Sequence, residues 1–144
     1  MNKPYSSTIL VLCGIILMGL GLYFVFLRPP LLPEDARYMG ASLAEIQATA
    51  PGLFNWLQKV FWVMGGYIFT TGPLTLYVTF TAFRMRASGA VWIVAAAGLT
   101  SIGWMAVVNF IIGSDFKWLL FGFALLWGIA LLPFDYDCLH DKQG

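Results

Sequence analysis

Residues 9–27 read ILVLCGIILMGLGLYFVFL and contain no charged side chain. An uncharged apolar run of about 18 residues or more is typical of a helix that crosses a membrane. The run is too long for the apolar part of a cleaved signal peptide, and the residues that follow it are bulky where a cleavage site needs small ones. We therefore expect a retained first span over residues 8–27.

Three further apolar runs follow. Residues 60–83 and 87–114 carry no charged side chain, and a shorter run, 118–134, lies between Lys117 and Asp135. Because the links between these runs are short, neighbouring helices should run antiparallel. We predict an all-α membrane protein built as an antiparallel bundle of four transmembrane helices, with spans at about residues 8–27, 54–83, 90–112 and 118–134.

The composition favours lipid as the surroundings of most side chains. Hydrophobic residues make up 60% of the chain and charged residues 10%, against about 45–50% and about 25% in soluble domains. A soluble fold of 144 residues could not bury so much apolar surface. The length indicates one domain, and the net charge of +1 argues against nucleic acid as a partner.

The first link, residues 28–53, holds signals of its own. Pro29, Pro30 and Pro33 predict an extended path after the first span. Ser42 and Glu45 have the spacing of a capping box, which predicts a short helix as far as Ala50. Residues 53–60 then repeat apolar side chains at helical spacing, so the link should include a short amphipathic helix at the membrane interface.

The orientation follows weakly from the basic residues. Each side of the predicted bundle holds four: Lys3, Arg84, Arg86 and Lys142 on one side, and Arg28, Arg37, Lys59 and Lys117 on the other. Arg84 and Arg86 share one tight turn, whereas the opposite set is mixed with acidic residues. The positive-inside rule then places both termini in the cytoplasm. The expected location is the inner (plasma) membrane of a bacterium.

A polar stripe runs along the second span. Tyr67, Thr71, Thr75 and Thr79 recur every four residues and therefore share one helix face. Gly72 and Pro73 interrupt the same helix, and Pro73 should kink it. The hydroxyls can bond to carbonyls of their own helix, which is the commoner use. The alternative is a polar-lined cleft for a lipid, a quinone or another amphiphile.

Asn109 is the one strongly polar side chain of the third span. Antiparallel packing puts it at the depth of Gly65 and Gly66, where glycines would let the two helices approach. An amide in hydrocarbon needs a partner, so Asn109 is expected to be an interhelical clamp. The alternative is a group that orients a ligand at the mouth of a cleft.

Small residues mark where helices should touch. The first span carries Gly14, Gly19 and Gly21, and small pairs four residues apart occur in the third and fourth spans, for example Ala124 and Gly128. Small residues are enriched where membrane helices pack closely. Trp104 and Trp127 fall deep in their spans and are expected to be packing residues, each needing a partner for its N–H group.

The polar groups outside the spans indicate no catalytic, metal or cofactor site. Arg28, Glu34, Asp35 and Arg37 are expected to form local ion pairs in a solvated link. The short tail, residues 135–144, contains Cys138 and His140, but their spacing is not that of a usual zinc site.

No aspartate, glutamate, lysine, arginine or histidine lies inside the four apolar runs, which disfavours pumps, ion-coupled transporters and haem proteins. We therefore expect a non-enzymatic membrane protein. Its expected role is that of an accessory or oligomerising subunit, with a second copy or another membrane protein as partner. The alternative is a binder or carrier of a small hydrophobic molecule of lipid or quinone type. Its cleft would lie between the second and third spans.

Overall fold

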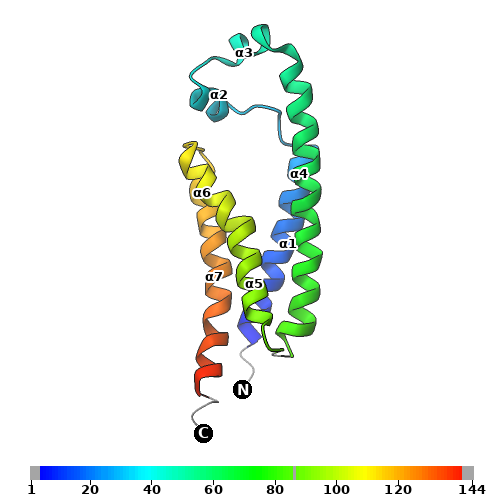
Figure 1. Cartoon of the computed structure of the whole chain (residues 1–144), viewed down its shortest axis with the longest axis vertical. Coiled ribbons are helices and arrows are strands. Elements are labelled where there is room, and N and C mark those ends of the chain that lie inside the picture. The colour runs from blue at the N-terminus through cyan, green and yellow to red at the C-terminus, as the bar shows by residue number, and fades with distance from the viewer. Residues whose placement is uncertain (1–3, 86, 141–144) are drawn as a thin grey trace.

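The structure is a computed structural model that describes residues 4–85 and 87–140, with side chains over 5–85 and 87–132. Within these ranges the chain forms helices, turns and links and no strand, which confirms the all-α prediction. The helices in order are α1 (Pro4–Phe26), α2 (Pro33–Met39), α3 (Leu43–Thr49), α4 (Pro51–Val78), the π-helical turn η1 (Thr79–Phe83), α5 (Ala90–Gly98), the π-helical turn η2 (Leu99–Gly103), α6 (Trp104–Ile111) and α7 (Lys117–His140) (Figure 1).

Two helical stretches, Tyr5–Phe26 and Ala90–Ile111, are long and apolar enough to cross a membrane. Only 28% and 22% of their most apolar windows are buried inside the fold, so most of these side chains are at least partly exposed. The rod made by α4 and η1 is longer but carries the threonines, and the apolar part of α7, Lys117–Leu132, is shorter. Length and composition therefore support a span at two of the four expected places.

The last helix is longer than expected. α7 begins at Lys117 and continues to His140, past the expected end of the fourth span at residue 134. α7 continues through Pro133, and residues 134–140 after it contain neither glycine nor proline. The residues expected to form a tail are thus helical as far as His140.

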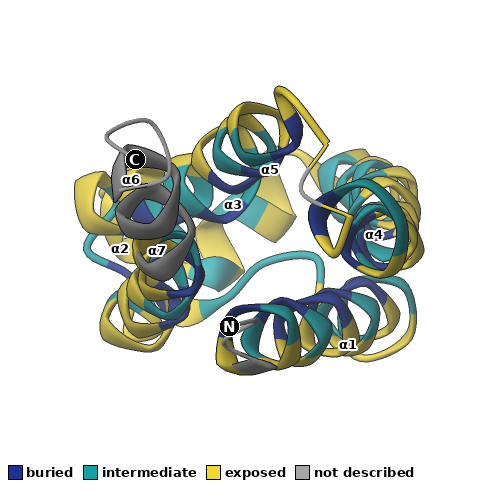
Figure 2. Cartoon of the chain, turned by 90° about the horizontal axis from the view of Figure 1, so that it is seen from below, coloured by how far each residue is buried: buried dark blue, intermediate teal, exposed yellow. Residues whose placement is uncertain are grey.

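A close seam joins α1 to α4, which lie side by side along most of their length. Figure 2, a view along the helices, shows the buried part of α1 turned toward α4. A Cβ atom added to Gly21 would lie 2.5 Å from the backbone nitrogen of Phe69, and one added to Gly72 would lie 2.7 Å from the carbonyl oxygen of Gly14. No side chain fits at such separations, so the glycines are what allow the two backbones to touch.

Two glycine expectations need correction. Gly19 faces open space, so only Gly14 and Gly21 serve the seam on the α1 side. Gly65 was expected to admit the third span, but it lies against the carbonyl oxygen of Gly21 in α1. The sequence pattern identified contact residues but could not say which neighbour each one meets.

A second close contact holds α5 to α7. The indole Nε1 of Trp127 donates a hydrogen bond to the carbonyl oxygen of Val94 (3.0 Å), and the side chain is buried. Gly98 leaves room for this indole, because a Cβ atom at residue 98 would overlap it. Trp127 is therefore a packing residue with a bonded N–H group, as predicted.

The first link contains one helix that was predicted and one that was not. The backbone N–H of Ser42 donates to Glu45 Oε2 (2.7 Å), and the N–H of Glu45 donates to Ser42 Oγ (3.2 Å), which confirms the capping box of α3. The bond from the Ser42 N–H, helped by the Ser42 hydroxyl, holds the pKa of Glu45 below its usual value.

The other link helix, α2, corrects the expected extended path. Pro33 is at the first helical turn, where its missing N–H costs nothing and its fixed φ suits a helix. Asp35 accepts a bond from the N–H of Leu32 (2.9 Å), and Gly40 ends the helix with φ of +71°. Pro33 therefore starts a helix instead of preventing one.

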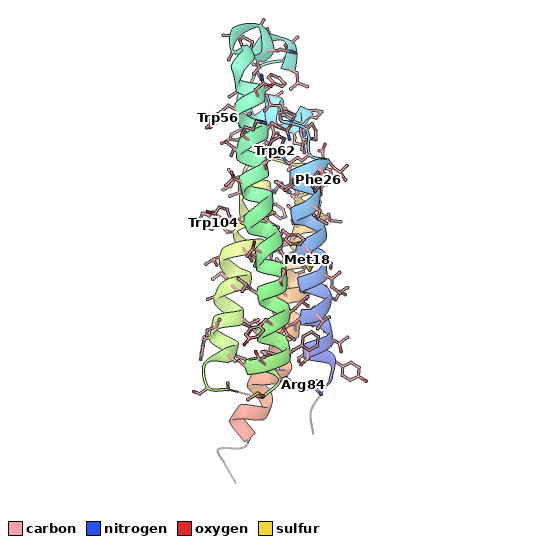
Figure 3. The ribbon with its side chains drawn as sticks, turned by 90° about the vertical axis from the view of Figure 1, so that its right-hand side faces the viewer. Met18, Phe26, Trp56, Trp62, Arg84 and Trp104 are labelled. Atoms are coloured by element: carbon pink, nitrogen blue, oxygen red, sulfur yellow. The ribbon has the colours of Figure 1, made fainter. Side chains whose placement is uncertain are left out.

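The two halves of the molecule separate toward the link. In Figure 1, α6 and the adjoining part of α7 lean away from α1 and α4, and α2 lies beyond the gap that this leaves. The described charged side chains lie near the two ends of the long helices. Figure 3 shows Arg84 at one end and Trp56 and Trp62 toward the other. The separation is what creates the candidate site.

Candidate functional site

A cleft of about 750 Å³ lies between α1 and α4 on one side and η2, α6 and α7 on the other. Most of its lining is apolar, including Leu17 and Leu20 of α1, Ile68 of α4, and Met105 and Val108 of α6. Pockets for small molecules usually have about 300–1,000 Å³ and a mainly apolar wall with a few polar groups. The cleft has the size and lining of such a pocket.

The cleft opens sideways between α4 and α6. Tyr67 and Trp104 both line it, yet they remain 75% and 65% exposed. Figure 3 shows Trp104 projecting away from the ribbon. These two side chains therefore stand at its open edge, and Trp104 does not have the packing role expected for it.

The turn η2 divides one helical rod into two parts with different neighbours. Before it, α5 contacts both α7 and α4, whereas after it α6 packs mainly on α7. A π-helical turn holds more residues than an α-helical turn, so it changes which helix face meets a neighbour, and such turns are frequent at functional sites. Ser101 and Ile102 belong to η2 and line the cleft.

The polar stripe of α4 is divided between the cleft and the packed interior. Each threonine hydroxyl donates to the carbonyl four residues earlier: Thr71 to Tyr67 (2.9 Å), Thr75 to Thr71 (2.8 Å) and Thr79 to Thr75 (2.7 Å). Tyr67 and Thr71 line the cleft, whereas Thr75 and Thr79 are buried outside it. The threonine hydroxyls thus bond to backbone carbonyls of their own helix. The two stripe residues nearer the first link, Tyr67 and Thr71, also face the cleft.

Gly72 and Pro73 do not face the cleft. Gly72 is buried in the seam with α1, and α4 runs on through Pro73 without ending. Pro73 withholds the N–H that would bond to the carbonyl of Phe69. The kink expected at this position stays a prediction.

Asn109 lines the same cleft from α6. Its Nδ2 donates to the carbonyl oxygen of Met105 in its own helix (2.9 Å), so this bond does not run to the second span as the clamp interpretation expected. The structure therefore brings together three of the predicted residues, Tyr67, Thr71 and Asn109, around one space.

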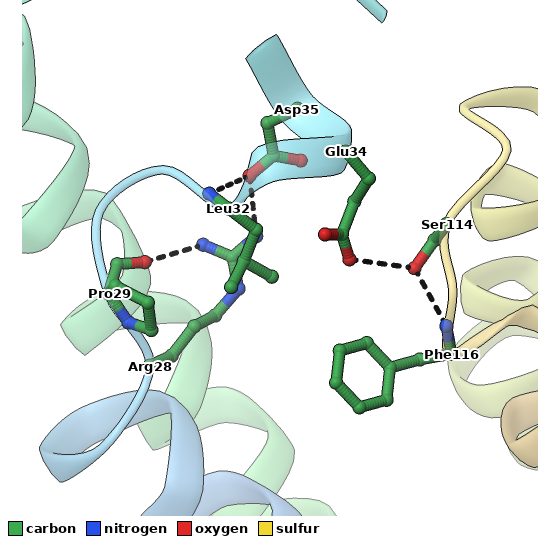
Figure 4. A network of polar contacts seen from close by, with 7 residues as sticks. All are labelled: Arg28, Pro29, Leu32, Glu34, Asp35, Ser114 and Phe116. Atoms are coloured by element: carbon green, nitrogen blue, oxygen red, sulfur yellow. Dashed lines mark hydrogen bonds and ion pairs between the residues drawn. The ribbon is translucent and has the colours of Figure 1, made fainter. Parts of the chain in front are cut away.

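A charged group closes the end of the cleft nearest the first link, which we call the link end (Figure 4). The expected ion pairing of Arg28 is present, but no sequence pattern predicts that it lies at a cleft. Arg28 Nη2 lies 3.4 Å from Asp35 Oδ2, and these side chains are only 11% and 18% exposed. Arg28 also donates to the carbonyl of Pro29 (3.2 Å), and its guanidinium carbon is 3.5 Å from the centre of the Phe61 ring. The ion pair and the ring hold the arginine in one place.

The environment of Arg28 is apolar enough to affect its ionisation. Burial lowers the pKa of the Arg28 guanidinium, and the nearby Asp35 carboxylate opposes that change. Arginine stays charged because its ordinary pKa is far above neutral. The link end of the cleft therefore holds a fixed positive charge paired with Asp35.

Glu34 is the most deeply buried charged side chain of the described residues, at 3% exposed, and it also lines the cleft. Ser114 Oγ donates to Glu34 Oε1 (3.3 Å) and accepts a bond from the N–H of Phe116 (3.1 Å). The expectation of a solvated link is thus wrong for Glu34, Arg28 and Asp35. It failed because the link folds onto the far helices.

α2 is tied to both halves of the molecule. Asp35 binds Arg28 at the end of α1, while Glu34 meets Ser114 in the turn before α7. Arg37 forms an exposed ion pair with Asp115 in that same turn (3.2 Å). The Pro-Glu-Asp start of a helix was the one sequence signal for α2, but no local pattern connects Glu34 to a turn eighty residues away.

Among the described residues no group of three or more histidines, cysteines or carboxylates could hold a metal ion. The tail cysteine and histidine, Cys138 and His140, lie beyond the residues whose side chains are described. No family model matches the chain, and neither a curated protein nor a solved structure matches it significantly.

Proposed function

We propose that this protein is a multi-pass membrane protein that binds a small amphiphilic molecule in the cleft between its helices. Four rods would cross the bilayer: α1, α4 with η1, α5 with η2 and α6, and α7. At 1.5 Å per residue, the 23 residues of α1 extend about 35 Å, enough for a hydrocarbon layer of about 30 Å. The outward-facing apolar side chains of Tyr5–Phe26 and Ala90–Ile111 support this placement.

The cleft is the observation that carries the proposal. Its walls are apolar and its link end is charged, so a bound molecule would have an apolar body and a polar head. The open edge at Tyr67 and Trp104 would face lipid, which gives an amphiphile a route from the bilayer. We propose binding rather than catalysis, since the lining is mainly apolar and the Arg28 and Asp35 side chains are engaged with each other.

Native mass spectrometry of the full chain from mild detergent tests this proposal. Thr71→Phe places a ring in the cleft, whereas Thr70→Phe makes the same change at the next residue, which is exposed and does not line the cleft. Both hydroxyls bond to their own helix, so the two variants lose equivalent bonds. We expect a small molecule to be retained by the wild type and Thr70→Phe and lost from Thr71→Phe. Equal retention by both variants would refute a ligand in this cleft.

An accessory or oligomerising subunit is the second candidate. Gly122 and Gly128 of α7 are both exposed and face open space, so each leaves a flat patch where another helix could lie. The same spectra report the oligomeric state. A dimer that is lost in Gly122→Leu and kept in Gly19→Leu would support this candidate, since Gly19 also faces open space.

The proposed location is a bacterial inner membrane with both termini in the cytoplasm. Cys13 is buried, so a membrane-impermeant thiol reagent added to intact cells would report on Cys138. Cytoplasmic termini predict labelling only after the cells are opened. Labelling of intact cells would reverse the orientation.

A further inference from the structure

The charges at the link end of the cleft do not balance. Three charged side chains line it there, Arg28, Glu34 and Asp35, which leaves one negative charge in excess. The described residues form two ion pairs, Arg28 with Asp35 and Arg37 with Asp115, and neither includes Glu34. The excess therefore resides on Glu34.

Glu34 is held in place with nothing of opposite charge bonded to it. Its hydrogen bond comes from the neutral hydroxyl of Ser114. Figure 4 shows the carboxylate directed into the space between Arg28 and the Phe116 ring, while the guanidinium is turned to Asp35 and Pro29. A buried carboxylate without a bonded positive partner is costly. The Arg28 guanidinium also attracts Glu34 through space, but its ion pair is with Asp35. A positive group entering the cleft would remove that cost.

The aromatic lining suits the same kind of group. Phe24, Phe61 and Phe116 line the cleft near the charged end, and Tyr67 and Trp104 line its open edge. Aromatic faces attract cations, and sites for quaternary ammonium groups are commonly built from them. Phe61 already holds one cation in this way, the guanidinium of Arg28.

We infer that the ligand of the cleft is a lipophilic cation, with an ammonium group beside Glu34 and an apolar body along α1, α4 and α6. This inference rests on the proposed binding function and adds the sign of the ligand's charge. The ammonium group has two sources, a free hydrophobic amine or a lipid with an amine or choline headgroup.

The test uses the full chain in lipid nanodiscs and three probes that share one alkyl tail: decyltrimethylammonium, decanol and decyl sulfate. We expect wild-type protein to bind the cation at least about tenfold more tightly than decanol, because the trimethylammonium charge is attracted to the Glu34 carboxylate and to the aromatic faces, whereas decanol is neutral. Decyl sulfate should bind most weakly. Glu34→Gln should remove the preference for the cation and leave decanol binding within about twofold.

Glu45→Gln is the matched control. It makes the same chemical change at an exposed residue of the same link, and glutamine still fits a capping box. It should keep the wild-type order of the three probes, and Glu34→Asp, which retains the charge, should keep the cation preference. If Glu34→Gln does not fold, the order of the three probes on the wild type still decides.

The outcomes separate the two proposals. Suppose that decanol binds the wild type but not Thr71→Phe, and that the cation binds no more tightly than decanol. The cleft is then a binding site, but the inferred charge of its ligand is wrong. If no probe binds, the binding function fails as well. Native mass spectrometry distinguishes the sources: a retained lipid with an amine or choline headgroup, lost in Glu34→Gln, identifies a lipid ligand. Probe binding without such a lipid identifies a free amine, and a retained anionic lipid overturns the inference.

Discussion

The two interfaces of α4 differ in what fills them. Toward α1, glycines bring backbone against backbone, and the space will not accept one added carbon at Gly21 or Gly72. Toward α6, the same helix faces a cleft of about 750 Å³ lined by larger side chains such as Tyr67 and Ile68. Close packing stabilises a fold. An open cleft lacks those stabilising contacts but provides room for a ligand.

The largest effect is expected in the seam. Gly21→Ala should lower the free energy of unfolding by about 3 kcal/mol, because the new methyl group would meet the backbone of Phe69. Unfolding in mixed micelles, followed by circular dichroism, measures it. Gly19→Ala makes the same change where space is open, and alanine favours a helix over glycine by up to about 1 kcal/mol. Equal effects at the two positions would mean that α1 and α4 are not in close contact.

A substitution in the contact between α5 and α7 should also lower the free energy of unfolding, but by less than one in the seam between α1 and α4. Trp127→Phe loses the bond to the Val94 carbonyl and leaves a void beside Gly98, so we expect a loss of about 2 kcal/mol. Trp92 is 75% exposed, and Trp92→Phe should change stability by less than about 0.5 kcal/mol. The same unfolding measurement compares the two, and a small effect of Trp127→Phe would show that this contact is loose.

The smallest effect is expected in the cleft. Thr71→Phe adds a ring to open space, and the hydroxyl it removes bonds only within α4. We expect its free energy of unfolding to stay within about 1 kcal/mol of the wild type, although it should abolish ligand retention. A loss as large as that of Gly21→Ala would contradict an open cleft, since it would mean that residue 71 is already closely packed.

Local patterns were sufficient for the helices and several of their ends. The four apolar runs correspond to the long helices, and Ser42 with Glu45 starts α3 as a capping box should. Helix formation and capping depend on residues a few positions apart, so the sequence carries their signals directly. Pro33 is ambiguous in the sequence because proline both ends and begins helices, and here it begins α2.

The sequence indicated only some of the residues of the candidate site. Tyr67, Thr71 and Asn109 stood out because polar side chains are rare in apolar runs. Glu34 and Ser114 did not, since acidic residues and serines are common in links and turns. Their contact depends on where α2 and the turn before α7 come together in space.

The sequence by itself determined that the chain is helical, mostly apolar and charged only outside its long runs, because these properties depend on composition and on short-range periodicity. Only the tertiary structure decided which glycines meet, that α6 departs from α4, and that Glu34 is buried at the end of a cleft. These facts depend on how separate helices pack. Packing is set by the fit of surfaces far apart in the chain, and no local pattern records that fit.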